Sequence, residues 1–317
     1  MNVYFFDKAN EIFYFCPKKM RYLFGFICFP LFLHFSNAQT KIPRKIKLPP
    51  ELREVSGLYD AAPDSLWWHN DSGDQPRLVL TDAKGHLKKQ IFLKAQNKDW
   101  EDITADNQGN IYIGDFGNNQ NKRTDLRIYI YRPDTETLDS ILFNYPDQQA
   151  FPPAPAQCNF NMEAFFWQQD TLHLFSKNQL LKGNYYTKHY ILPAHPGTFT
   201  ATLQDSIYLK KRVVTAAAVS KDGQTMVLLA YFYKIYLHLI PITHTTLYTF
   251  QKEEGKPLLQ GEMRKKRVGK FLIPTQYECL DFIDLETVYI ASERTPLFKQ
   301  QAKRVKLKGV KKKAIKP

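Results

Sequence analysis

The sequence predicts an all-β protein, a β-propeller of five four-stranded blades, with a sixth, degenerate blade left open. The 317 residues include 18 Tyr and 23 Phe, and aromatic and β-branched residues suit strands. No long amphipathic helical pattern occurs after residue 38. A short motif recurs five times at a spacing suited to propeller blades. The recurrence argues against a β-sandwich, which is the alternative architecture with similar strand content.

Each copy of the motif is a short strand that begins near a glutamate, a turn, and an apolar strand that ends in a small or polar residue. Residues 106–109 and 220–223 have the Asn, Asp and Gly content of hairpin connectors. The spacing between copies ranges from 47 to 62 residues, which leaves room for the sixth blade. The paired strands of the five copies fall at residues 54–58 and 65–71, 100–103 and 110–115, 162–165 and 171–176, 215–219 and 225–231, and 277–280 and 287–292.

Further strand candidates between the copies complete the blades. They follow the second copy at residues 126–131 and 140–143, and the fourth copy at residues 234–240 and within 246–273. The extended segment 42–48 precedes the first copy. We expect it to supply the outer strand of the last blade beside residues 304–307, because closure of the ring removes open sheet edges.

The N-terminus predicts a cleaved secretory signal over residues 1–38. Lys18, Lys19 and Arg21 precede an apolar run over residues 23–35, and Ala38 ends a small-residue cleavage site. Translation starting at Met20 gives a signal of ordinary proportions. The alternative is a retained anchor, for which the run is short, because a spanning helix needs about 20 apolar residues. The expected location is therefore secreted or periplasmic, without a transmembrane anchor, and the propeller spans residues 39–307.

The formal net charge of +13 is concentrated at the C-terminus. Residues 299–317 hold nine Lys and Arg residues and no acid, and residues 308–317 form a basic tail. Such a tail is solvated, or touches an anionic surface. A nucleic-acid partner is not expected, because no aromatic residues alternate with these bases. We expect a monomer, in which Cys158 and Cys279 form either one disulfide or two buried thiols.

Repeated glutamates define the candidate site. The first strand of each propeller blade lines the central channel, so Glu54, Glu101, Glu163 and Glu278 should converge at one mouth, with Ala217 interrupting the ring. The second strands end in polar residues near the same axis. The predicted ligand-binding set comprises Glu54, His69, Asp71, Glu101, Asp115, Asn118, Glu163, Lys177, Glu278, Glu293 and Arg294.

Crowded carboxylates need compensation, because their mutual repulsion raises their pKa values. A bound Ca²⁺, which takes oxygen ligands, is one source, and the predicted ligands are Glu101, Asp102, Asp115 and Glu163. Nearby bases such as His69 are another. In the structural alternative, each Glu accepts backbone N–H bonds from the neighbouring blade and only locks the ring.

Known catalytic signatures are missing from the sequence. There is no HExxH, G-x-S-x-G, Walker or dinucleotide motif, and the cysteines lack CxxC spacing. Residues 115–117 read DFG without the other kinase motifs. The Asn-rich loop 114–125 is either part of the pocket or an ordinary long hairpin loop. His69 is either an acid or base or a hydrogen-bonded strand end.

Four short motifs resemble the SdiA-regulated and phytase-like esterase propellers of secreted bacterial proteins. They are Glu54-Val-Ser-Gly-Leu, Asp99-Trp-Glu-Asp-Ile, Asn161-Met-Glu-Ala-Phe and Gln276-Tyr-Glu-Cys-Leu, and the resemblance covers most of residues 51–294. The resemblance implies a secreted or periplasmic propeller, often with calcium at the channel and, in the phytase-like branch, a phosphoester substrate. Two departures are the count of five blades, where related folds have six, and Ala217.

Three functions remain open at this stage. The first is a binding module, stabilised by Ca²⁺, whose channel mouth takes a small molecule, a glycan or a partner protein. The second is a metal-dependent hydrolase of phosphoesters or carboxylic esters, with Lys177 and Arg294 holding the anion. The third is a scaffold without a small-molecule site.

Overall fold

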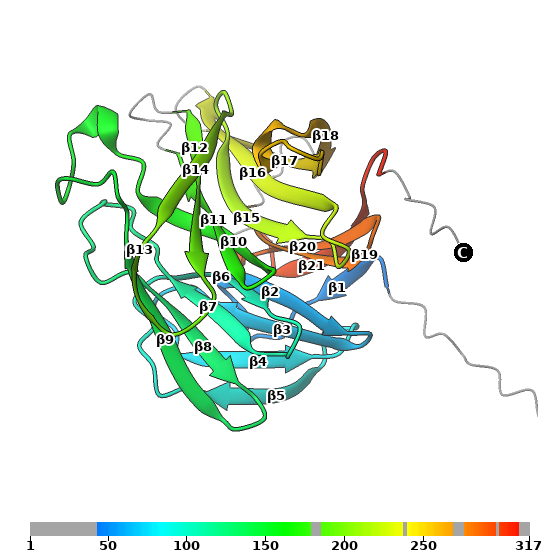
Figure 1. The fold of residues 1–317 in the computed structure, drawn as a ribbon. Helices are drawn as coiled ribbons and strands as arrows, with labels where there is room; N and C mark the ends of the chain where they lie inside the picture. Colours follow the sequence, from blue (N-terminus) through cyan, green and yellow to red (C-terminus); the bar gives the residue numbers. More distant parts are fainter. Residues whose placement is uncertain (1–42, 179–184, 237–239, 269–275, 296–297, 311–317) are drawn as a thin grey trace, which may run out of the picture. The chain divides into compact units, whose positions relative to one another are not determined.

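Five antiparallel sheets make up the computed structural model, which describes residues 43–178, 185–236, 240–268, 276–295 and 298–310 (Figure 1). The predicted signal segment and the end of the basic tail lie outside these ranges. Each sheet forms one blade. In blades 1 to 4 the four blade strands follow chain order from the innermost to the outermost, and in blade 5 the first strand of the chain, β1, is the outermost. Blade 1 contains β2 (Val55–Ala62), β3 (Ser65–Asn70), β4 (Arg77–Thr81) and β5 (Leu87–Phe92). Blade 2 contains β6 (Trp100–Ala105), β7 (Ile111–Asp115), β8 (Arg127–Arg132) and β9 (Thr137–Asn144).

The other three blades follow the same plan. Short 3-10 turns η1 (Pro155–Gln157) and η3 (Leu258–Gln260) lie in connecting segments. Blade 3 contains β10 (Asn161–Gln168), β11 (Thr171–Lys177), β12 (Tyr186–Pro193) and β14 (Thr202–Tyr208). Blade 4 contains β15 (Val213–Val219), β16 (Thr225–Tyr236), β17 (Ile240–Gln251) and β18 (Glu262–Val268). Blade 5 contains β19 (Tyr277–Asp284), β20 (Thr287–Ser292), β21 (Gln301–Lys306) and β1 (Lys45–Lys47).

The blades close into a ring of five. Each innermost strand contacts the innermost strands of two other blades, in the order β2, β6, β10, β15, β19 and back to β2. The predicted closure is confirmed, because β1 pairs with β21 through Ile46 and Ala302 as the outer strand of the last blade. The five-blade count is therefore correct.

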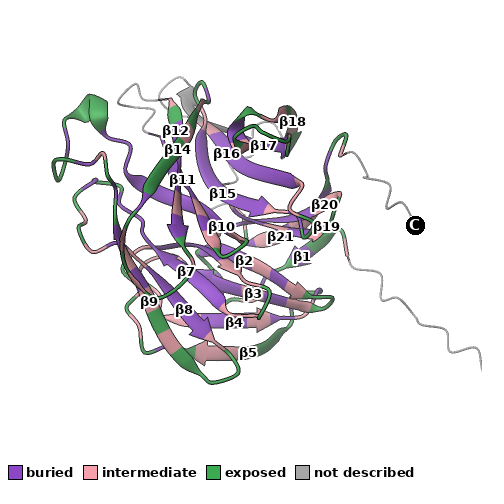
Figure 2. Ribbon diagram, in the orientation of Figure 1, coloured by how far each residue is buried: buried purple, intermediate pink, exposed green. Residues whose placement is uncertain are grey.

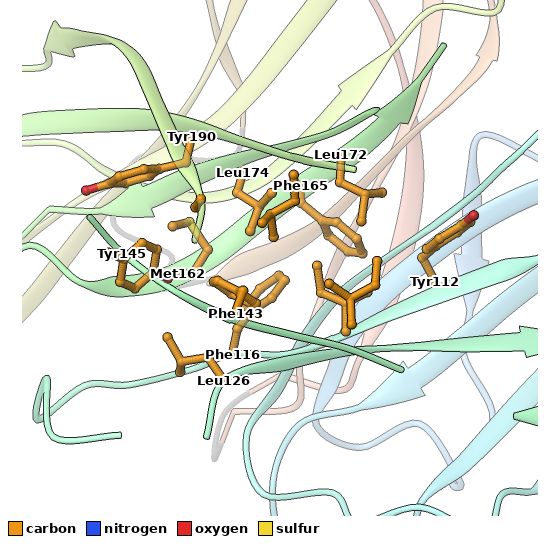
Figure 3. Close-up of a cluster of buried hydrophobic side chains, with 14 of the residues drawn as sticks. Tyr112, Phe116, Leu126, Phe143, Tyr145, Met162, Phe165, Leu172, Leu174 and Tyr190 are labelled. Carbon is orange, nitrogen blue, oxygen red and sulfur yellow. The ribbon is translucent and has the colours of Figure 1, made fainter. Parts of the chain in front are cut away.

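The hydrophobic core is divided among the blade interfaces. Among the described residues, five buried clusters each draw side chains from two adjacent blades. Between blades 2 and 3, Phe116 packs edge to face against Phe143 and Phe165, with ring centroids 6.4 and 5.2 Å away (Figure 3). Every blade packs against both of its neighbours. The innermost strands are therefore largely buried, and contacts on two sides fix their positions (Figure 2).

The outer edges are more exposed and more irregular. On β18, partly buried and exposed positions alternate in an outer strand rich in Lys and Arg, a composition that protects an edge from pairing. A short strand β13 (Gly197–Thr200), from the connection between β12 and β14, pairs in parallel with β9 and covers the edge of blade 2. Blades 2 and 3 are therefore joined at their periphery as well as by their core.

The structure corrects one expected strand and decides between the two alternatives for the cysteines. The strand expected at residues 234–240 is divided between β16 and β17, since Tyr236 already pairs with Ile240. Residues 237–239 lie outside the described part of the chain, and the positions on either side of them pair with each other in one antiparallel ladder. Cys158 and Cys279 are both buried and no disulfide joins them, so the two-thiol alternative holds. Within the described ranges, no helix has the length and apolar character needed to cross a bilayer.

Candidate functional site

A β-bulge lies near the start of every innermost strand. The pairing register shifts between Met162 and Ala164 in β10, and at the corresponding place in β2, β6, β15 and β19. A bulge adds a residue that is unpaired in the ladder and re-aims its side chain, and such features often border active sites. The bulged positions are Ser56, Glu101, Glu163, Thr215 and Glu278.

This register corrects the alignment inferred from the sequence. Glu54 does not match Glu101, because the bulge places Ser56 there, and blade 4 contributes Thr215 rather than Ala217. A shift of two residues keeps the same face of a strand, so the sequence pattern tolerated the error. The ring at this position therefore contains three carboxylates and two hydroxyls.

The second strands add another ring of side chains at the same mouth. Lys177 pairs with Asn161, and Tyr231 occupies the matching place in blade 4. Asp71 and Glu293 directly follow the paired ends of β3 and β20. We call this end of the channel the acidic mouth; its carboxylates are Glu54, Asp71, Asp99, Glu101, Glu163, Glu278 and Glu293.

Three of these carboxylates converge closely. One ligating oxygen each of Asp71, Asp99 and Glu101 lies within 4.8 Å of the other two. Glu101 is 8% exposed, and among the described residues its carboxylate has no hydrogen-bond or ion-pair partner. The three carboxylates therefore repel one another, and the buried Glu101 carboxylate is available to coordinate a cation.

Gly117 forms one wall of this cluster. A Cβ atom at this position would lie 2.2 Å from Oε1 of Glu101 and 2.4 Å from Cγ of Asp99. The backbone N–H of Gly117 donates to the carbonyl oxygen of Asp99 at 3.1 Å. Phe116, the preceding residue, anchors the segment in the core between blades 2 and 3. Only a residue without a side chain allows the main chain to approach these two carboxylates.

Burial and mutual repulsion disturb the titration of the cluster. Burial, followed by the Asp71 charge, raises the pKa of Asp99 to about 7. Burial, followed by Glu163 and Asp71, raises the pKa of Glu101 well above its ordinary value. Burial and the neighbouring Glu293 do the same for the pKa of Glu278. A cation at the mouth would oppose each of these shifts.

Lys177 places a positive charge in the acidic mouth. Lys177 forms an ion pair with Glu163, which also accepts a 2.9 Å hydrogen bond from Asn161. Burial lowers the pKa of Lys177, but Glu163 and Tyr231 outweigh it and hold that pKa well above its usual range. Lys177 is therefore charged, and its ammonium lies 5.9 Å from the centre of the Tyr231 ring.

The loop after β7 supports the cluster from behind. Arg123 donates to Oδ1 of Asp115 at 3.1 Å and to the Gly117 carbonyl at 2.9 Å. The same Asp115 oxygen accepts from the backbone N–H of Asp99. Oδ1 of Asn118 accepts from the N–H groups of Lys122 and Arg123, at 2.8 and 3.0 Å. Asp115 and Asn118 thus shape the loop that holds Gly117.

The four predicted metal ligands occupy different environments. Glu101 belongs to the close cluster, Glu163 pairs with Lys177, and Asp115 pairs with Arg123. Asp102 lies deeper and is fully buried. Its carboxylate accepts backbone N–H bonds from Ile103 at 2.9 Å, from Phe165 at 3.1 Å and, at the limit of 3.5 Å, from Ala217. It links blade 2 to blades 3 and 4 across the channel.

His69 and Arg294, which belong to the same predicted ligand-binding set as Lys177, occupy other positions in their blades than Lys177 does. His69 precedes Asp71 by two residues and is fully buried, with its ring edge to face against Trp100 at 5.5 Å. Burial lowers the pKa of His69, so the ring is neutral. A Cβ atom at Gly57 would lie 2.2 Å from Nε2 of His69. Arg294 is exposed one residue beyond the matching place.

In the structural alternative the glutamates lock the blades together, but the hydrogen bonds between neighbouring innermost strands come from other groups. The Ser56 hydroxyl donates to the carbonyl of Glu101, and the Thr215 hydroxyl donates to the carbonyl of Tyr277 at 3.1 Å. Asp102 provides the deeper link. Among the described residues, no hydrogen bond from a neighbouring blade's backbone reaches the Glu101 carboxylate.

Sequence reasoning missed Asp99, Asn161, Tyr231 and Arg123. The first two lie two residues before Glu101 and Glu163, and strand side chains repeat with a period of two. That period was a usable signal, because both residues open the repeated motifs. Tyr231 and Arg123 come from a second strand and a loop, where no repeat marks them.

No protein-family model matches the chain, and no curated protein matches it. Similar solved structures include the virginiamycin B lyase of Staphylococcus aureus, at 8% identity and a TM-score of 0.41, covering 84% of this chain and 88% of that one. A gluconolactonase of Xanthomonas campestris has 11% identity and a TM-score of 0.44, covering 82% and 88%. A glucose dehydrogenase has 9% identity and a TM-score of 0.45, covering 84% and 99%. TM-scores below 0.5 at these identities carry no argument about activity.

Proposed function

We propose that the acidic mouth binds a Ca²⁺ ion through Asp71, Asp99 and Glu101, and that the ion and Lys177 together bind an anionic ligand. The function is that of a binding module, with the channel mouth as its recognition surface. The proposal includes membership of the SdiA-regulated and phytase-like propellers. It also includes export of the protein to the periplasm or out of the cell.

The observation that carries the proposal is the unpaired, buried carboxylate of Glu101 within 4.8 Å of two further acidic ligands. Burying an ion without a partner is costly, and the usual remedies are an opposite charge or a metal. Ca²⁺ suits this site because it prefers carboxylate oxygens and tolerates irregular geometry. The three acids also leave coordination positions for water or for a ligand.

Lys177 supports the anionic character of the ligand. Glu163 and Asn161 fix its position at the mouth, and its pKa keeps it charged. A cation held by Asp71, Asp99 and Glu101 would add positive charge on the other side of the channel. A phosphate or carboxylate group fits between two such charges, because each can share one of its oxygens.

A metal-dependent hydrolase of phosphoesters or carboxylic esters is the second candidate. It is favoured by the pairing of a metal-binding geometry with a fixed Lys177, because such a pair can bind and orient an ester oxygen. A bound metal would supply Lewis acidity there. Asp71, Asp99 and Glu101 would hold the metal, and Lys177 would orient the anionic part of the substrate.

Glu101→Gln tests the metal site directly. A cation at about 100 times its Kd stabilises the folded protein by about 2.7 kcal/mol. We therefore expect Ca²⁺ to raise the Tm of the wild-type protein relative to EDTA, and Glu101→Gln to abolish this rise. In EDTA the variant should be at least as stable as the wild type, because a repelling carboxylate has been neutralised. Thermal melts and metal analysis of the purified protein measure both effects.

The matched control is Glu253→Gln, which neutralises a partly exposed glutamate that pairs with Lys256 in the β17–β18 connection, and it should retain the full Ca²⁺ response. Failure of the wild type to bind or respond to Ca²⁺ would remove the proposal. A Glu101→Gln variant that only loses stability in EDTA would return the glutamate to a structural role. A phosphatase and esterase screen in Ca²⁺ then separates the hydrolase from the binding module.

A further inference from the structure

A cavity lies at the end of the channel opposite the acidic mouth. Its volume is about 770 Å³, which falls within the range of small-molecule pockets. All five innermost strands line it near their ends, together with the β6–β7 and β15–β16 turns. These strands begin at the acidic mouth, so the cavity is the far mouth of the same ring.

Asp102 separates the two ends. Its side chain accepts N–H bonds from blades 3 and 4, and it is 0% exposed. None of the acidic-mouth carboxylates is among the residues that line the far cavity. A ligand of the far cavity would therefore bind independently of the function proposed for the acidic mouth.

Asp60 is the unusual residue of the far cavity. It is 8% exposed and lines the cavity, and among the described residues its carboxylate has no hydrogen-bond or ion-pair partner. Its backbone N–H donates to Oδ2 of Asp281 at 2.7 Å, and Oδ1 of Asp281 accepts from Phe282 at 2.8 Å. Asp281 is thus already held by the backbone, whereas Asp60 has its full acceptor capacity available.

The charges around Asp60 are mostly negative. Asp60, Asp106, Asp222 and Asp281 line the cavity, against Lys221 and Lys252. Asp106 and Asp222 accept backbone N–H bonds within their own turns. No ion pair joins either lysine to Asp60 or Asp281 among the described residues. The available negative charge is therefore concentrated at Asp60 and Asp281.

We propose that the far cavity binds a small organic cation that carries an ammonium group, with Asp60 and Asp281 as its anchors. An ammonium has three donors and no acceptor, so it matches carboxylates that lack donors. Tyr59 and Trp167 also line the cavity and offer aromatic surface to the alkyl part of such a ligand. An anionic ligand would meet unpaired carboxylates and be repelled.

The titration of the pair agrees with this ligand class. Burial, followed by Asp281, raises the pKa of Asp60 to about 7, and burial raises the pKa of Asp281 to about 7, with Lys221 opposing both. Asp60 also acts electrostatically on Tyr59 and Tyr289, whose pKa values burial and the nearby acids raise to about 12. An ammonium should displace a proton from the pair, so its affinity should rise between pH 6 and pH 8.

Three probes of equal length test the charge of the ligand. They are 1,4-diaminobutane, the neutral 1,4-butanediol and the dianion succinate, each titrated calorimetrically into the full protein. We expect saturable binding of the diamine alone. Asp60→Asn should weaken that binding by about tenfold or more, the effect of losing one charge-assisted hydrogen bond. Asp134→Asn, in the exposed β8–β9 turn and outside the lining of both mouths, is the matched control and should leave diamine affinity unchanged.

The outcomes are decisive in both directions. Saturable diamine binding that weakens in Asp60→Asn and tightens with pH supports the site. Equal binding of butanediol would indicate a polyol site and overturn the proposal, as would absence of diamine binding or an unchanged affinity in Asp60→Asn. Because the Asn side chain matches Asp in shape, a thermal melt that shows folded variant protein makes a loss of binding interpretable. Asp281→Asn gives a second, independent test of the same pair.

Discussion

The two ends of the channel are built from the same five strands but balance their carboxylates differently. At the acidic mouth, bulged strand starts aim acids inward, and Lys177 contacts one of them directly. At the far mouth, the strands end in hairpins, and neither Asp60 nor Asp281 forms an ion pair among the described residues. A buried acid at the start of an innermost strand therefore lies among other carboxylates, whereas a buried acid near the end of such a strand lines an open cavity.

Asp102 is the boundary between these regions. The matching positions in the other blades are Gly57, Ala164, Ala216 and Cys279, which are small. One acid among small residues can reach the backbone of two further blades. The same side chain therefore ties three blades together.

Replacing Asp102 should have the largest effect of the changes considered. Asp102→Ala would leave the N–H groups of Ile103 and Phe165 buried without their acceptor. Each such group costs about 1–3 kcal/mol, so we expect the two together to lower the free energy of unfolding by about 2–6 kcal/mol. Urea denaturation followed by Trp fluorescence measures it.

Asp82→Ala is the control for Asp102→Ala. Asp82 accepts N–H bonds from Lys84 and His86 in the exposed β4–β5 turn, so its loss should cost about 1 kcal/mol. Equal losses in the two variants would mean that Asp102 does not unite the ring. Retained ligand responses at both mouths after Asp102→Ala would show that its side chain is not needed to keep the two sites intact.

The pH dependence of stability should be the next largest effect, and it compares the two mouths directly. Acids with raised pKa values in the folded state bind more protons folded than unfolded, so their contribution to stability falls as pH rises from about 4 towards 7. Each such acid contributes at most about 1.4 kcal/mol per pH unit. In EDTA, Glu101→Gln and Asp60→Asn should each flatten this decline. Ca²⁺ should flatten it only where Glu101 is present.

Denaturation curves of the wild type and both variants between pH 4.5 and pH 7.5 measure these slopes. The differences from the wild type isolate Glu101 and Asp60, because Asp64, Asp82 and Asp125, whose pKa values are lowered, act identically in all three proteins. A variant that declines more steeply than the wild type would contradict the assigned direction at its mouth.

The fold was predictable because its information is repeated. Five similar motifs indicated five blades, and the segment before the first motif indicated closure by β1. The convergence of acids at one mouth followed from the same repeat. The far cavity was not predictable, since Asp106 and Lys221 have turn signatures, and Asp60 and Asp281 share no motif.

The strand register within the acidic mouth could not be predicted from the sequence, and the reason is physical. A bulge inserts one residue without a characteristic residue type, so spacing alone could not separate Glu54 from Ser56. The structure gives the bulged position a hydroxyl in blades 1 and 4 and a carboxylate in blades 2, 3 and 5. One backbone device thus serves both blade locking and site construction.

The smallest expected effect comes from removing the bulge hydroxyls, and it should separate blade locking from metal binding. Ser56→Ala and Thr215→Ala each remove one buried hydroxyl that donates to the next blade, so each should cost about 1 kcal/mol of stability. Neither hydroxyl belongs to the Asp71, Asp99 and Glu101 cluster, so the Ca²⁺-induced rise in Tm should be unchanged. Thr135→Ala, at an exposed turn, is the control and should be neutral. Loss of the Ca²⁺ response in Ser56→Ala would mean that blade locking and metal binding at the bulges are one property, because the hydroxyl would then be needed to position Glu101.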